Sequence, residues 1–130
     1  LRLFGMLYVP ELGDGDVEIA GFELGEYRVA FGVSSDGQLW GQEAGRRLMG
    51  EGTIPVGRWA SFRWDVNLYD DGTGTAKLRF GNDFIVNVDT LTPPTSSEST
   101  IAGTVGLSEA TGTWTMRFDN LTFEVKELTP

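Results

Sequence analysis

Apolar and polar residues alternate along much of the chain, which is the pattern of β-strands that bury one face. The clearest case spans residues 59–69, where every second side chain is apolar: Ala60, Phe62, Trp64, Val66 and Leu68. Residues 75–80 and 84–89 alternate in the same way, and the second run places Phe84 with Val86 and Val88 on its apolar face. Loops rich in Gly, Asp and Asn separate the three runs. We therefore predict a three-stranded antiparallel meander with one apolar and one polar face.

Further strands are predicted on both sides of the meander, at residues 1–9, 17–22, 27–33, 38–40 and 101–107. Residues 41–52 are broken by Gly, and a short helical turn is open near residues 46–49. Residues 92–100, with two Pro and several Ser and Thr, predict an exposed loop. The apolar positions change parity at Asp119 and Asn120, which predicts a bulge or sharp bend there. About ten strands without an internal repeat predict an all-β fold, an antiparallel two-sheet sandwich.

The composition excludes several classes of function. The 130 residues carry a net charge of −9, which argues against nucleic acid as a partner because such binding depends on clustered Lys and Arg. The chain has no Cys and no His, so thiolate catalysis, zinc–thiolate sites and the Ser-His-Asp and Cys-His mechanisms are excluded. No apolar run approaches 18 residues, so we expect no membrane insertion.

Five short segments share a rhythm of Gly, Trp, Asp and apolar residues with a known family: residues 56–59 (VGRW), 68–72 (LYDDG), 77–81 (KLRFG), 104–107 (TVGL) and 118–123 (FDNLTF). Together they resemble the concanavalin A-like, laminin-G-like jelly rolls. The resemblance implies a single jelly-roll domain over residues 1–130 and leaves open whether N-terminal strands are missing. Members of that family include sugar-binding modules, glycosidases, polysaccharide lyases and adhesion or spacer domains, so the resemblance bears on the fold more than on the activity.

The polar face of the meander supplies candidate ligand-binding residues. In the resembling family, one sheet often binds glycans through planar hydrogen-bonding groups. The candidate carbohydrate-binding residues are Trp40, Arg63, Asp65, Asn67, Lys77 and Arg79. Trp40 lies between glycines and is expected to be the exposed aromatic side chain. The alternative is a ladder of cross-strand charge pairs, each contributing roughly 0.2–1 kcal/mol.

Two groups of acidic residues raise the questions of catalysis and of metal binding. A retaining glycosidase needs two carboxyl groups about 5–5.5 Å apart, and Asp16 and Glu18 share a predicted strand face. Their spacing to Glu23 departs from the Glu-x-Asp-x-Glu arrangement of the resembling hydrolases, so we assign no catalytic residue and predict that the protein is not an enzyme. A structural calcium ion is conceivable at residues 70–71 or 119–120, although turns favour Asp and Asn without a metal. We assign no cofactor and no metal site.

These observations lead to a prediction of a non-catalytic extracellular module that is carbohydrate-binding or adhesive. The alternative is a structural subunit or spacer in an extracellular fibre or surface assembly. A glycoside hydrolase or a polysaccharide lyase is less favoured. The expected partners are a glycan or neighbouring protein chains, the latter meeting residues 1–9, whose two faces both carry apolar side chains. The acidic composition favours an extracellular or cell-surface location.

Overall fold

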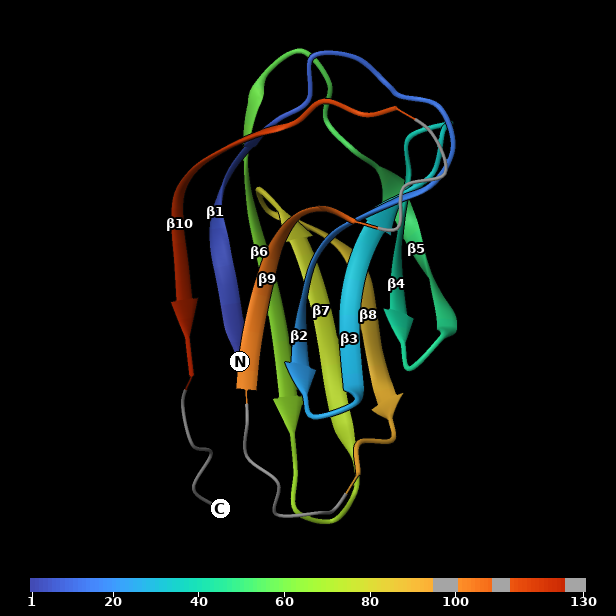
Figure 1. Ribbon diagram of the computed structural model, residues 1–130, viewed down its shortest axis with the longest axis vertical. Helices are drawn as coiled ribbons and strands as arrows, with labels where there is room; N and C mark the ends of the chain where they lie inside the picture. The colour runs from blue at the N-terminus through green and yellow to red at the C-terminus, as the bar shows by residue number, and fades with distance from the viewer. Residues whose placement is uncertain (95–100, 109–112, 126–130) are drawn as a thin grey trace.

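The computed structural model describes residues 1–94, 101–108 and 113–125 of the chain. In this part of the chain ten strands form two antiparallel sheets of five strands each. The described residues contain no helix. The sheets lie one in front of the other in Figure 1. The prediction of an all-β, two-sheet antiparallel sandwich of about ten strands is therefore confirmed. No helix of the described residues is long and apolar enough to cross a membrane.

The first sheet, called sheet A, has the strand order β10-β1-β6-β7-β8. Its strands are β1 (Arg2–Tyr8), β6 (Trp59–Leu68), β7 (Gly74–Phe80), β8 (Asp83–Leu91) and β10 (Arg117–Glu124). Strands β6, β7 and β8 are the predicted meander, which is confirmed. Strand β1 pairs with β6 on one side and with β10 on the other, so it has no free edge for a neighbouring chain. Backbone pairing of residues 1–9 with another chain is therefore wrong, whereas apolar contact of these residues with a neighbouring chain stays a prediction.

The second sheet, called sheet B, has the order β5-β4-β3-β2-β9. Its strands are β2 (Val17–Leu24), β3 (Tyr27–Val33), β4 (Gln38–Glu43), β5 (Arg46–Thr53) and β9 (Ile101–Ser108). The helical turn considered near residues 46–49 is wrong, because β5 occupies these residues. Ala44 and Gly45 have φ angles of 47° and 88°, so the chain reverses there and continues as an antiparallel strand. Residues 95–100 of the predicted exposed loop lie outside the described residues.

The core lies between the sheets and is formed by the inward-facing side of each alternating strand. Phe62 and Trp64 of β6 have ring centroids 5.9 and 5.4 Å from that of Phe31 of β3, so they join the two sheets. All three side chains are at most 2% exposed. Burial of each such side chain contributes roughly 1.5–3 kcal/mol. The outward face of β6 is fixed as a consequence, because a shift by one residue would expose these rings.

Strand β8 departs from the predicted alternation through a bulge. Leu78 pairs with Val86 and Arg79 with Phe84, so Ile85 is an extra residue. Ile85 and Val86 are both buried, whereas Phe84 is 56% exposed on the outer face. The prediction that Phe84 lies on the apolar face with Val86 is therefore wrong, since a period of two residues cannot reveal an inserted residue.

The bulge predicted at Asp119 and Asn120 is confirmed. Phe4 pairs with Thr122 but Met6 pairs with Asp119, so the register of β10 slips between them. Asn120 has a φ of 53°, in the left-handed region that Asn tolerates better than most residues. The Asn120 amide N–H donates to the Asp119 carboxylate at 2.9 Å.

Glu43 is a buried carboxylate that joins three segments at one end of the sandwich. It accepts hydrogen bonds from the Tyr27 hydroxyl (2.6 Å), the Thr92 backbone N–H (2.6 Å) and the Arg46 guanidinium (2.7 Å). Burial raises the pKa of Glu43, but these hydrogen bonds outweigh burial and hold its pKa below 4.5. Burial and the adjoining Glu43 carboxylate raise the pKa of Tyr27 in turn.

The folded protein is predicted to lose the contribution of Glu43 in acid. The folded state binds a proton at Glu43 less readily than the unfolded state does. The stabilisation that ionised Glu43 provides is therefore complete above pH 4.5. It is lost as the pH falls through the lower pKa of the folded state. At pH 7 the Glu43→Gln variant should be less stable by about 2 kcal/mol in urea unfolding. The difference should shrink on acidification, and a constant difference down to pH 3 would contradict the assignment; exposed Glu26→Gln is the control.

Gly32 of β3 is predicted to tolerate no side chain. A Cβ there would lie 2.3 Å from the Val17 carbonyl oxygen and 2.4 Å from the Trp40 ring. Gly32→Ala should lower the free energy of unfolding by about 1–3 kcal/mol, measured by urea titration. Gly41→Ala is the matched control, because its Cβ would meet nothing closer than 3.4 Å. Equal effects of the two substitutions would contradict the prediction.

Candidate functional site

The outer face of sheet A carries a cavity of about 420 Å³, which we call the arginine cavity. It lies over β1, with walls from β6, β7 and β10. Three guanidinium side chains line it, those of Arg2, Arg63 and Arg79. The apolar side chains of Phe4 and Met6 also line it. The cavity therefore combines positive charge with an apolar wall.

The strand register explains why these side chains meet. Arg63 of β6 lies opposite Phe4 of β1 on one side and opposite Arg79 of β7 on the other. Neighbouring strands are about 4.8 Å apart, and directly opposed residues point to the same face. Arg2 lies on the same face at the next outward position of β1, opposite Asp65. The core-facing alternation of three strands thus sets the arginines on one surface.

The positive charges of the arginine cavity are incompletely neutralised. Asp65 lies 2.7 Å from Arg2 Nε and 3.3 Å from Arg63 Nε, so one carboxylate serves two guanidinium groups. Arg63 Nε is buried and makes no hydrogen bond, since the contact with Asp65 lacks the required geometry. Among the described residues no carboxylate forms an ion pair with Arg79, whose guanidinium lies 5.9 Å from the centroid of the Phe84 ring. Glu124 is on the cavity wall. The cavity can therefore accept a negatively charged group.

Five of the six predicted site residues lie on this face of sheet A, but they divide by role. Arg63 and Arg79 line the cavity, and Asp65 holds two of its arginines. Asn67 donates to the Thr75 hydroxyl at 3.2 Å, and Lys77 is exposed outside the cavity lining. Their use for binding stays a prediction.

Trp40, the sixth predicted residue, lies on the opposite side of the sandwich in sheet B and is 3% exposed. The expectation that it is exposed is wrong. Gly32 pairs with Trp40 and has no side chain, so the indole lies against the strand. The Arg47 guanidinium covers the other face, 3.8 Å from the ring centroid.

Sequence reasoning missed Arg2, Phe4 and Met6. Their alternation within residues 1–9 was a usable signal, because every second side chain there reaches the same face. The pattern does not show that β1 pairs with β6, and this pairing alone brings Arg2 to Asp65.

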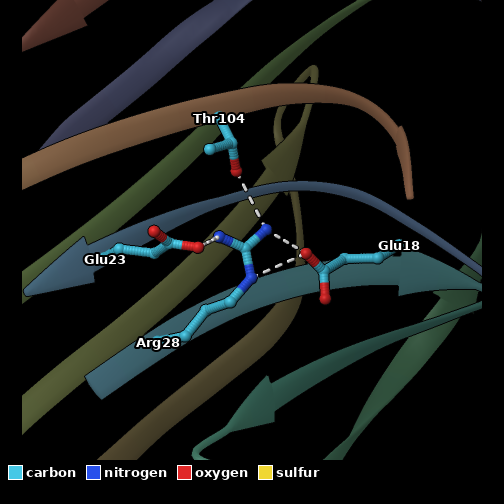
Figure 2. A network of polar contacts seen from close by, with 4 residues as sticks. All are labelled: Glu18, Glu23, Arg28 and Thr104. Atoms are coloured by element: carbon cyan, nitrogen blue, oxygen red, sulfur yellow. Dashed lines mark hydrogen bonds and ion pairs between the residues drawn. The ribbon is translucent and has the colours of Figure 1, made fainter. Parts of the chain in front are cut away.

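The outer face of sheet B carries a polar network of a different kind, shown in Figure 2. Arg28 donates to Glu18 through two nitrogens, to Glu23 at 2.9 Å and to the Thr104 hydroxyl at 2.9 Å. The network joins β3 to the neighbouring strand β2 and reaches across β2 to β9. Asp16, the other carboxylate considered for catalysis, lies 3.5 Å from Arg47. Both carboxylates of the considered pair thus have a guanidinium partner, which indicates a structural role.

The acidic turns show the local role expected of Asp in turns. Asp71 accepts hydrogen bonds from the Thr73 hydroxyl and backbone N–H, which lower the pKa of Asp71. In residues 1–94, 101–108 and 113–125, no three Asp or Glu side chains lie close enough together to hold a metal ion. A structural calcium ion stays a prediction.

The chain matches no protein-family profile and no curated protein sequence. Among solved structures it is similar to SCP-B, a member of the eqolisin family of peptidases, determined in complex with the tripeptide Ala-Ile-His. The TM-score is 0.40 and the sequence identity is 15%, over 92% of this chain and 71% of the peptidase.

The similarity to this peptidase contradicts the sequence-based prediction of a non-catalytic, carbohydrate-binding or adhesive module. It also contradicts the prediction that the protein is not an enzyme. Neither prediction is retained, nor are the structural-spacer and glycosidase alternatives. A likeness at this TM-score assigns no activity to the chain. The resemblance to concanavalin A-like domains stays a prediction.

The Arg28 network is predicted to stabilise sheet B without affecting the arginine cavity. Glu18 is 3% exposed, so replacing Arg28 by Met removes a guanidinium from a buried carboxylate and should cost about 3 kcal/mol in urea unfolding. The double variant Arg28→Met with Glu18→Met should recover part of that loss. If the double variant loses at least as much free energy of unfolding as the two single variants together, the pairing is contradicted.

Proposed function

We propose that the arginine cavity binds an organic carboxylate that carries an apolar group. The observation that supports this most directly is the convergence of Arg2, Arg63 and Arg79 on one cavity, with Asp65 as the one ion-pair partner they have among the described residues. Guanidinium groups of like charge repel one another. A bound carboxylate would offset that repulsion.

The chemistry of the lining fits such a ligand. Arginine presents a planar fork of N–H donors that matches the two oxygens of a carboxylate. Phe4 and Met6 would cover the hydrocarbon part of the ligand. A volume of about 420 Å³ lies in the range of small-molecule sites, roughly 300–1,000 Å³.

The geometry also sets the electrostatic character of the site. The chain as a whole carries −9, so a positive cavity attracts anions only at close range, within about 10 Å at moderate salt. We therefore expect binding that weakens with salt but does not depend on long-range attraction. The proposal concerns recognition of the carboxylate and assigns no reaction.

The proposal is tested with 3-phenylpropionate, which has one carboxylate and one aromatic ring. Calorimetry should detect saturable binding, and the neutral 3-phenylpropanamide should bind at least about tenfold more weakly. Arg79→Ala should weaken binding of the acid by about tenfold or more, because Arg79 lines the cavity and has no described ion-pair partner to lose.

Lys77→Ala is the matched control, since it removes one positive charge from the same face outside the cavity. Equal binding of the acid and the amide would overturn the proposal. An equal loss in the Lys77 and Arg79 variants would also overturn it, because the attraction would then come from general charge. The urea midpoint of each variant checks that it is folded.

A further inference from the structure

A second cavity, of about 730 Å³, adjoins the arginine cavity at the end of the sandwich where β6 begins and β7 turns into β8. The two cavities share Met6, Ser61 and Gly81 in their linings. The remaining walls of the second cavity come from residues 53–55, the start of β6 and the turn between β7 and β8. The two hollows therefore meet and form one groove, which we call the sheet A groove.

The second cavity has an aromatic wall. Trp59 lines it and is 44% exposed, so part of the indole surface is open to a ligand. The Trp59 ring packs against Tyr8 of β1, with ring centroids 5.5 Å apart. Tyr8 holds the indole from one side, so the exposed indole surface is a preorganised contact for an apolar or aromatic group.

Polar groups of both signs line the rest of the groove. The second cavity contains Arg58, Asn82 and Asp83, and the arginine cavity contains Asn120 and Glu124. Donors and acceptors are therefore available along the groove, whereas the surplus of positive charge is confined to the arginine end. This distribution suits a ligand with one charged end and a neutral, hydrogen-bonding body.

We infer that the sheet A groove binds an extended peptide, with its C-terminal carboxylate at Arg2, Arg63 and Arg79 and an aromatic side chain against Trp59. This inference rests on the proposed carboxylate binding and specifies the ligand. Arg2 lies six residues along β1 from Tyr8, the residue paired with Trp59, so about 20 Å separates the arginine end from the aromatic wall. An extended peptide of about six residues has that length.

The polar lining favours a peptide over other long anions. A peptide backbone provides N–H donors for Asp83 and Glu124 and carbonyl acceptors for Asn82 and Asn120. A fatty acid would cover these groups without satisfying their hydrogen bonds, which disfavours its binding. A polyanion would place further negative charges beside the two carboxylates.

The inference is tested with the acetylated hexapeptide Trp-Ser-Gly-Ser-Gly-Phe carrying a free C-terminal carboxylate. Calorimetry should show binding at least about tenfold tighter than that of 3-phenylpropionate, because the peptide fills both cavities. Amidation of its C-terminus, or replacement of its Trp by Ser, should each lose about tenfold. Decanoate, which has the length without the hydrogen-bonding body, should bind no tighter than 3-phenylpropionate.

The Trp59→Ala variant tests the peptide groove separately from the carboxylate site. It should weaken binding of the hexapeptide by about tenfold and leave the affinity for 3-phenylpropionate unchanged, because Trp59 lines only the second of the two cavities. Tyr69→Ala is the matched control, since Tyr69 is 43% exposed and lines neither cavity.

The outcomes distinguish failure of the inference from failure of the proposed function. If 3-phenylpropionate binds through Arg79 but the hexapeptide gains nothing and ignores Trp59→Ala, the peptide groove is wrong and the carboxylate site stands. If decanoate binds as tightly as the hexapeptide and with the same dependence on Trp59, the ligand is not a peptide. If neither small carboxylate nor peptide binds, both proposals fail.

Discussion

The position of β1 between β6 and β10 holds both faces of sheet A in register. It completes sheet A, buries Leu3 and Leu7 against the core, and places Arg2 and Phe4 beside Asp65 and Arg63. The same hydrogen-bonded register therefore serves the core on one face and the arginine cavity on the other. A slip of one residue would exchange the faces and remove both at once.

The alternation of apolar and polar residues was sufficient to predict the strands and the outward-facing side chains of β6 and β7. Arg63, Asp65, Asn67, Lys77 and Arg79 do share one face, because the neighbours of each are held by the core. The same alternation failed at Phe84, where a bulge adds a residue, and at Trp40, where Gly32 and Arg47 bury an aromatic ring. Pairing between distant strands has no local signal, so Arg2 and its neighbours in the cavity could not be placed. The extracellular location stays a prediction from composition.

The two outer faces use charge in opposite ways. On sheet B, Arg28 is surrounded by Glu18, Glu23 and the Thr104 hydroxyl, and Arg47 lies between Trp40 and Asp16. On sheet A, three arginines have one described carboxylate partner. In a chain of net charge −9, with 19 acidic and 10 basic residues, the local surplus of cations is a departure from the average surface. That contrast, rather than the presence of arginines alone, supports the proposal that sheet A carries the binding site.

The arginine cavity joins Arg2 of the first strand to Asn120 and Glu124 of the tenth. During synthesis the first strand leaves the ribosome long before the tenth, and such long sequence separations slow folding. The arginine cavity consequently has its full lining only after β10 has docked. A nascent chain without β10 would carry the three arginines but lack the wall of Asn120 and Glu124, so the cavity would stay open on that side.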